Sequence, residues 1–247
     1  MHEPLVPAPL VFRDDGTPWS PRHDDIYHSA AGALSQARHV FLNGNGLPER
    51  WRGKPHFNVL ETGFGMGINF LATWAAWRDD PQRPASIHFI SVEKYPFSAS
   101  DLRRALAAII DDASVMPLAA SLAAAWPVLV TGIHRIELEQ RALTLTLAFG
   151  DVMDVVPRLK QDGMTADAIY LDGFAPARNP DMWTPALFAS LAGMASDDAS
   201  FATYTSAGQV KRALLQNGFE YRKVRGFGGK RAMLAGKRAS VSDEIIL

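Results

Sequence analysis

Beyond residue 56, short apolar runs alternate with longer segments whose apolar residues recur at helical spacing. The runs have the length of β-strands, and the segments between them have the length of helices. Such alternation predicts parallel strands joined by crossover helices, as in a Rossmann-like α/β sheet. The expected strands are 57–62, 87–93, 143–149, 166–171 and 199–205, and the expected helices are 68–78, 99–110, 152–160, 184–194 and 207–217.

The alternation breaks at both ends and once in the middle. Residues 219–224 and 231–235 predict an antiparallel pair that would complete a mostly parallel sheet of seven strands. Residues 1–56 are rich in Pro, Asp, His and Asn, and we interpret them as an N-terminal arm packed on the core. Residues 111–140 contain an Ala-rich stretch and a strand-like run, which indicate a small insertion on top of the sheet within a domain at 57–247.

Composition excludes several classes of site. With 247 residues and 47% apolar content, the chain can bury a sizeable core. The absence of cysteine removes disulfides, thiolate zinc sites and cysteine nucleophiles. No apolar run approaches the roughly 18 residues of a membrane span, and no signal peptide is evident, so we expect a cytoplasmic protein without membrane contact. The net charge of −1 means that any nucleic-acid contact requires a local basic patch.

A glycine-rich turn separates the first expected strand from the first expected helix. Glycine recurs there at every second position, which lets the backbone adopt positive φ and approach a ligand closely. A dinucleotide loop would have a third glycine where Ile68 stands. The spacing is instead typical of S-adenosylmethionine loops, although an ordinary strand–turn–helix corner is the simpler alternative. The expected cofactor contacts here are Glu61, Gly63, Gly65, Gly67 and Asn69.

Three acidic residues follow later strands. Ligands of doubly wound sheets lie outside the carboxyl ends of the strands, where these side chains are expected. Glu93 can accept hydrogen bonds from both ribose hydroxyls, and Asp151 can accept the adenine amino group or cap the next helix. Asp172 lies nearest the expected reacting centre. Each one alone is equally well explained as a helix cap or a solvated strand end.

Residues 171–183 contain prolines, a glycine and two aromatic residues. This composition predicts a stiff loop with flat apolar faces, suited to stacking on an extruded base. Phe174 and Pro176 are the expected substrate contacts in this loop. The alternative is a loop that packs on its own helix, with Trp183 and Phe174 in the core.

These motifs and several others closely resemble the methyltransferase domain of the MnmC family. The resemblance covers nearly the whole chain, and its departures are mild: Thr62 and Met66 stand where we expect Leu and Thr. Besides the glycine loop, the similar segments are 24–29, 40–45, 126–127, 132–135, 171–183, 203–208 and 226–234.

The resemblance implies S-adenosylmethionine-dependent N-methylation of the 5-aminomethyl group of a wobble (2-thio)uridine, in the anticodon region of tRNA. The exocyclic amine would attack the sulfonium methyl group, with Asp172 receiving or orienting the amine protons. Tyr27 lies in one of the similar segments and would contact the substrate. Methyl transfer of this type requires no metal.

MnmC proteins continue into a flavin-dependent oxidase domain that generates the aminomethyl group. This chain has no second glycine loop after Lys211, so we expect no FAD in it. It is either a stand-alone methyltransferase or a fragment of a longer enzyme. An FAD-dependent oxidase domain or partner would then supply the aminomethyl substrate.

Positive charge is concentrated near the C-terminus, where Glu220 is the one acid in a basic stretch. Such a cluster can hold tRNA phosphates while the wobble base enters the site, whereas a solvated charged face is the simpler interpretation. Lys230 and Arg231 are the expected substrate contacts, because they lie in the similar segment 226–234. The other members are Lys211, Arg212, Arg222, Lys223, Arg225, Lys237 and Arg238.

Two other functions share parts of this pattern. A Rossmann-like transferase for a small amine, such as a polyamine synthase, would have the glycine loop and the acidic strand ends but would not need the basic cluster. A non-catalytic tRNA-binding protein would have the same fold but would not transfer a methyl group.

Overall fold

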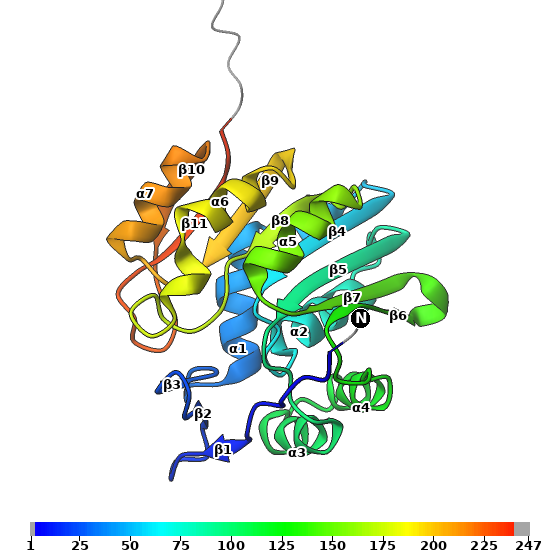
Figure 1. Ribbon diagram of the computed structural model, residues 1–247. Coiled ribbons are helices and arrows are strands. Elements are labelled where there is room, and N and C mark those ends of the chain that lie inside the picture. The colour runs from blue at the N-terminus through cyan, green and yellow to red at the C-terminus, as the bar shows by residue number, and fades with distance from the viewer. Residues whose placement is uncertain (1–2, 240–247) are drawn as a thin grey trace, which may run out of the picture.

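A computed structural model describes residues 3–239, so the outer ends of the expected arm and domain lie outside the described residues. Within them, the main sheet has eight strands in the order β10-β11-β9-β8-β4-β5-β7-β6 (Figure 1). The five central strands are parallel, which confirms the predicted α/β class. They are β4 (His56–Thr62), β5 (Ser86–Glu93), β7 (Leu143–Phe149), β8 (Ala166–Tyr170) and β9 (Ala195–Thr203).

Helices cover both faces of the sheet and give three layers (Figure 1). Successive strand residues point to opposite faces, so Val59 lies in one hydrophobic core and Leu60 in the other. The first core includes residues of α1 (Ala33–Ala37), α2 (Ile68–Asp79), α3 (Ala99–Ile109) and α4 (Met116–Ala124), and the second includes residues of α5 (Val152–Gln161), α6 (Pro185–Ala192) and α7 (Gly208–Gln216).

An eighth strand corrects the predicted count of seven. β6 (Gly132–Leu138) pairs antiparallel with β7 along its whole length and forms one edge of the sheet. The sequence suggested a strand here but placed it in an insertion on top of the sheet. Only Ile136 of β6 is buried, so this edge strand lacks the continuous apolar run that marks the central strands.

The opposite edge of the sheet has the predicted antiparallel pair, β10 (Phe219–Val224) and β11 (Met233–Arg238). β11 also pairs antiparallel with β9. Residues 225–232 form the loop between the two strands, and His39 Nε2 lies 2.9 Å from the carbonyl oxygen of Arg225 in this loop. The C-terminal basic loop and the N-terminal arm are therefore in direct contact.

The N-terminal arm has two parts. Its first part is a small antiparallel sheet of β1 (Val11–Phe12), β2 (Pro18–Ser20) and β3 (Asp25–Ile26). Its second part comprises α1 and short helical turns over Arg38–Leu42, Asn43–Asn45 and Glu49–Trp51. Phe41 and Trp51 from these turns are fully buried in the main core. The second part is thus integral to the fold.

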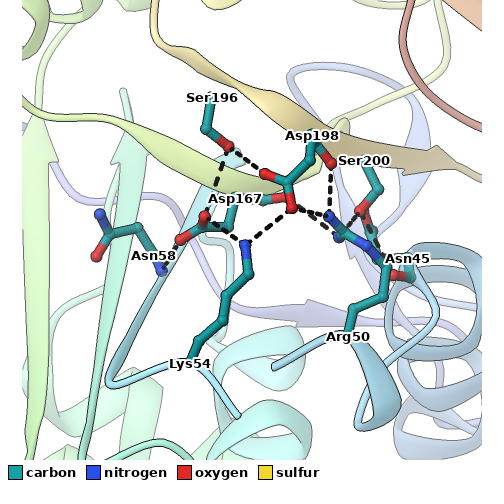
Figure 2. Close-up of polar contacts among 8 residues, drawn as sticks. All are labelled: Asn45, Arg50, Lys54, Asn58, Asp167, Ser196, Asp198 and Ser200. Atoms are coloured by element: carbon teal, nitrogen blue, oxygen red, sulfur yellow. Dashed lines mark hydrogen bonds and ion pairs between the residues drawn. The ribbon is translucent and has the colours of Figure 1, made fainter. Parts of the chain in front are cut away.

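A polar cluster fastens the end of the arm to the amino ends of β8 and β9 (Figure 2). Lys54 Nζ lies 3.2 Å from Asp167 Oδ1 and 3.0 Å from Asp198 Oδ2. Arg50 donates to the carbonyl oxygens of Asp167 and Asp198 and to the hydroxyl of Ser200. These contacts explain why β9 begins at Ala195 rather than at the predicted residue 199. Asp198 and Ser200, two polar residues of β9, are thus partners of the arm.

We predict that Arg50→Ala lowers the free energy of unfolding by about 1–3 kcal/mol, because it leaves two backbone carbonyls and a hydroxyl without their donor. Urea unfolding curves measure this change. Arg103→Ala, at an exposed position on α3, is the control and should stay within about 0.5 kcal/mol of the parent protein. Equal effects of the two substitutions would mean that the cluster does not stabilise the fold.

Candidate active site

A cavity opens at the carboxyl ends of the parallel strands. The cavity and the open space at its mouth together enclose about 1360 Å³. The β4–α2 loop, the ends of β5, β7 and β8, and the N-terminal arm all contribute to its wall. The glycine loop, the strand ends and the arm therefore meet at one site. This site lies outside the carboxyl ends of the strands, where doubly wound sheets bind their ligands.

The three alternating glycines all have positive φ: 117° at Gly63, 54° at Gly65 and 76° at Gly67. Gly63 and Gly65 line the cavity, whereas Gly67 does not. A Cβ at Gly67 would lie 2.7 Å from the Phe64 ring, so packing beneath the loop requires this glycine. Gly63 and Gly65 are therefore the glycines at which the backbone can approach a ligand closely.

Glu93 ends β5 behind the glycine loop and lines the cavity. Its carboxylate accepts hydrogen bonds from the backbone N–H groups of Gly65 and Tyr95, each at 2.8 Å. Desolvation nevertheless raises the pKa of Glu93 above its usual range. The backbone of Lys94 also donates to this carboxylate. Since a carboxylate has about four acceptor positions, one remains for a ligand.

Asp151 also lines the cavity, and it acts as the helix cap that the sequence allowed. Its Oδ1 accepts from the backbone N–H of Met153 at 2.9 Å, and its Oδ2 lies 2.7 Å from Lys94 Nζ. The hydrogen bond from Lys94 holds the pKa of Asp151 below its usual value. Asp151 is therefore an ionised, fixed acceptor at the wall.

Two carboxyl groups share one amide nitrogen beneath the glycine loop. Asn69 Nδ2 donates to Glu61 Oε1 at 2.9 Å and to Asp172 Oδ2 at 2.7 Å. Glu61 is fully buried outside the cavity wall, and desolvation raises its pKa to about 8. Asn69 and Asp172 line the cavity. Glu61 thus orients Asn69 from behind, and Asn69 orients Asp172.

Asp172 is fixed at the cavity wall by a second contact, since its Oδ1 accepts from the backbone N–H of Gly173 at 2.8 Å. Desolvation raises the pKa of Asp172 to about 6, and the positive charge of Lys230 opposes this rise. The carboxylate is therefore ionised at neutral pH and close to its titration range. A group with these properties can accept a proton in the cavity.

Aromatic side chains from the arm and from the loop after β8 form another part of the wall. Tyr27 and Phe174 line the cavity and make an edge-on contact, with ring centroids 5.0 Å apart. The ring of His23 stacks on that of Phe174, with their centroids 4.4 Å apart. Asp25 accepts a hydrogen bond from the backbone N–H of Ala175 at 2.9 Å, which ties the arm to the loop after β8. The faces of these rings offer surface on which a base can stack.

Several predicted substrate contacts do not line the cavity, namely Pro176, Lys230 and Arg231. Lys230 Nζ lies 4.2 Å from the ring centroid of Tyr204, whose hydroxyl donates to the carbonyl oxygen of Gly173. Arg231 is exposed on the 225–232 loop.

Two other residues, one from the 171–183 loop and one from the basic cluster, have structural roles. Trp183 is buried and donates to the carbonyl oxygen of Phe174, so it packs against its own loop. Arg238, counted in the basic cluster, donates to the carbonyl oxygens of Ala192 and Ala195 inside the fold.

The sequence did not single out several arm residues of the cavity. Arg22 and His23 lie between β2 and β3, and His28 and Gln36 flank the turn into α1. None belongs to a spacing motif, and only the folding of the arm brings them to the strand ends. For His28, the sequence contained one signal of a functional role, because the residue lies in segment 24–29, which resembles the MnmC family.

Comparison with known proteins agrees with this geometry. A family described as S-adenosyl-L-methionine-dependent methyltransferase matches residues 113–239. The chain belongs to this methyltransferase family. Its cofactor is S-adenosyl-L-methionine, and a cavity bordered by positive-φ glycines and by Glu93 with a free acceptor position fits such a ligand.

Curated relatives of this methyltransferase are named tRNA 5-methylaminomethyl-2-thiouridine biosynthesis bifunctional protein MnmC. The protein from Paraburkholderia phytofirmans is 61% identical over 236 residues, which is 96% of this chain and 36% of the relative. The protein from Paraburkholderia phymatum is 62% identical over 239 residues, again 36% of its length. The chain thus spans about a third of the length of these relatives.

A solved structure supports the fold. The crystal structure of MNMC2 from Aquifex aeolicus superposes with a TM-score of 0.75 at 21% identity, covering 95% of this chain and 71% of that one. The methyltransferase fold of this chain therefore persists at low sequence identity. In the part of the chain that the structure describes, no helix is long and apolar enough to cross a bilayer.

Proposed function

We propose that this methyltransferase transfers a methyl group to the 5-aminomethyl nitrogen of wobble (2-thio)uridine in tRNA, giving 5-methylaminomethyl-(2-thio)uridine. The names of relatives about 60% identical over nearly the whole chain support this substrate. The observation that carries the proposal is Asp172, a carboxylate fixed at the cavity wall with a pKa raised to about 6. It is suited to an amine that must lose a proton.

The cofactor placement in this proposal follows from the wall. Gly63 and Gly65 admit the ligand to the backbone, Glu93 accepts from a ribose hydroxyl, and Asp151 lies where it can accept the adenine amino group. Bound S-adenosylmethionine supplies an electrophilic methyl group on a sulfonium sulfur. Glu61 orients Asn69, and Asn69 in turn holds Asp172 beside this ligand.

The reaction requires a neutral amine as its nucleophile. If the pKa of the amine is near that of lysine, about 10.4, deprotonation at pH 7 costs up to about 4–5 kcal/mol. Desolvation in the cavity lowers this cost, and Asp172 accepts the proton that the ammonium form of the amine loses. The neutral amine then forms the nitrogen–carbon bond as the sulfur–carbon bond breaks, and the product leaves as a secondary ammonium. Tyr27 and Phe174 hold the base in line, which contributes on the order of 7–11 kcal/mol when the alignment is good.

The tRNA side of the site faces the 225–232 loop in this proposal. We assign phosphate contact to Arg231 and Lys230, with Pro176 on the flanking loop near the base. Lys230 reaches inward over Tyr204, so it is placed near the target nucleotide, whereas Arg231 projects from the loop. The protein would then work on tRNA in the cytoplasm.

We predict that Arg231→Gln weakens tRNA binding and reduces the slope of log affinity against log salt by about 0.7–0.9, the value for one lost phosphate contact. Binding titrations between low and moderate salt measure the slope. Arg158→Gln, at an exposed position on α5, is the control and should leave the slope unchanged. Equal slopes for Arg231→Gln and the parent protein would mean that Arg231 only faces solvent.

The relatives are named bifunctional and are more than two and a half times as long as this chain. We propose that an FAD-dependent oxidase, fused or separate, generates the aminomethyl group that this site methylates.

The decisive experiment is mass spectrometry of nucleosides from tRNA that carries 5-aminomethyluridine, after incubation with the chain and S-adenosylmethionine. A gain of one methyl group on that nucleoside supports the proposal. Tight binding of S-adenosylmethionine without methyl transfer would instead favour a non-catalytic tRNA-binding role. Methylation of free polyamines but not of tRNA would favour a small-amine transferase.

A further inference from the structure

Two polar side chains on the arm side of the cavity take no part in the chemistry described above. His28 and Gln36 both line the cavity, beside Tyr27. Both are hydrogen-bonded to the backbone of Ser29, which fixes them next to each other.

The hydrogen bond to Ser29 determines which nitrogen of His28 carries its proton. Nδ1 lies 3.1 Å from the carbonyl oxygen of Ser29, which can only accept, so Nδ1 must donate. Burial lowers the pKa of His28 below its usual value, which keeps the ring neutral. Nε2 is then a hydrogen-bond acceptor, and it is buried without a partner among the described residues. A buried polar atom of this kind is costly unless a ligand satisfies it.

The same reasoning orients the amide of Gln36. Its Oε1 lies 2.6 Å from the backbone nitrogen of Ser29, which can only donate. The oxygen of the amide is therefore committed to Ser29, and the NH₂ group is the end left for a ligand. The two side chains together offer one acceptor and one donor.

We propose that His28 and Gln36 recognise the edge of the target base, with His28 Nε2 accepting from the ring N3–H of uracil and the Gln36 amide donating to the adjacent carbonyl oxygen. This inference rests on the proposed function. The pattern is specific, because cytosine presents an acceptor at N3 and a donor at its amino group. Enzymes that act on an extruded base commonly read this edge by hydrogen bonds.

The test uses two RNA hairpins that carry 5-aminomethyluridine or 5-aminomethylcytidine at the wobble position. His28→Phe keeps a ring of similar size but has no acceptor. We expect kcat/KM for the uridine hairpin to fall by about 10-fold or more, because N3–H then lacks its partner. The cytidine hairpin should react as slowly as before, so the preference for uridine falls by the same factor.

A second variant and a control separate recognition from folding. Gln36→Glu keeps an acceptor for the Ser29 N–H but replaces the donor, and it should also reduce the preference for uridine. His56→Phe removes a histidine at the opposite end of β4, where its ring bonds Ser86, and should leave the preference unchanged. Calorimetry with S-adenosylmethionine should show the parent affinity in all three variants.

The outcomes distinguish the two claims. A parent protein that methylates the uridine hairpin, with His28→Phe showing an unchanged uridine preference, overturns the inference alone. An equal loss on both hairpins in His28→Phe overturns it as well, because it indicates a structural role for the ring. A parent protein that binds S-adenosylmethionine but methylates neither hairpin nor tRNA overturns the proposed function, and the inference with it.

Discussion

Replacing Asp172 with Asn is expected to lower the rate of methyl transfer at neutral pH by about 100-fold or more. The variant keeps an oxygen for the backbone N–H of Gly173 but cannot accept a proton. Its NH₂ group would also face Asn69 Nδ2, which now donates to Asp172. Single-turnover kinetics with aminomethyl-bearing tRNA measure the loss, and calorimetry should show a much smaller change in cofactor affinity.

The pH dependence tests the assigned role of Asp172. Because its pKa is raised to about 6, the carboxylate is ionised above that pH and protonated below it. The parent rate should therefore fall as pH drops through about 6, and the deficit of Asp172→Asn should shrink at high pH, where free amine becomes abundant without help. Asp197→Asn, at an exposed position on β9, is the control. Near-normal turnover of Asp172→Asn at neutral pH would show that solvent or the cavity itself deprotonates the amine.

Replacing Gly65 with Val is expected to abolish binding of S-adenosylmethionine. Gly65 has a φ of 54°, which a β-branched residue rarely adopts, and its N–H orients Glu93. A Cβ at this position would lie 3.6 Å from the Tyr27 ring, so the new methyl groups would extend into the cavity without a clash in the core. Calorimetry measures the affinity, and a parallel titration of the parent protein with NAD should show no binding.

Gly163→Val is the matched control for strain. Gly163 has a φ of 74° and open space around its Cβ position, but it lies between α5 and β8, outside the cavity. Both variants carry a strain cost of about 1–3 kcal/mol, which urea unfolding measures. Only Gly65→Val should lose the cofactor. Parent-like affinity in Gly65→Val would remove the glycine loop from the cofactor site.

The order of strands and helices was predictable because local pattern determines it. Central strands are buried on both faces, so they appear as apolar runs, and their crossover helices alternate with them. The edge strand β6 was placed wrongly, because a strand with one buried residue has no continuous apolar run. The sequence did not predict the early start of β9, because the partner of Asp198 is Lys54, which lies far away in the chain.

The sequence alone determined the α/β class, the glycine loop and the acids at the strand ends, since all three depend on neighbours within a few residues. It could not distinguish the roles of those acids. Glu61 is buried behind Asn69, whereas Asp172 meets the cavity, and only the packed structure decides this.

Tertiary structure likewise turned Trp183 into a core residue, directed Lys230 inward over Tyr204, and brought His28 and Gln36 to the cavity from the arm. The physical reason is that desolvation and hydrogen-bond partners, which set the chemistry of each group, come from segments that are distant in the chain.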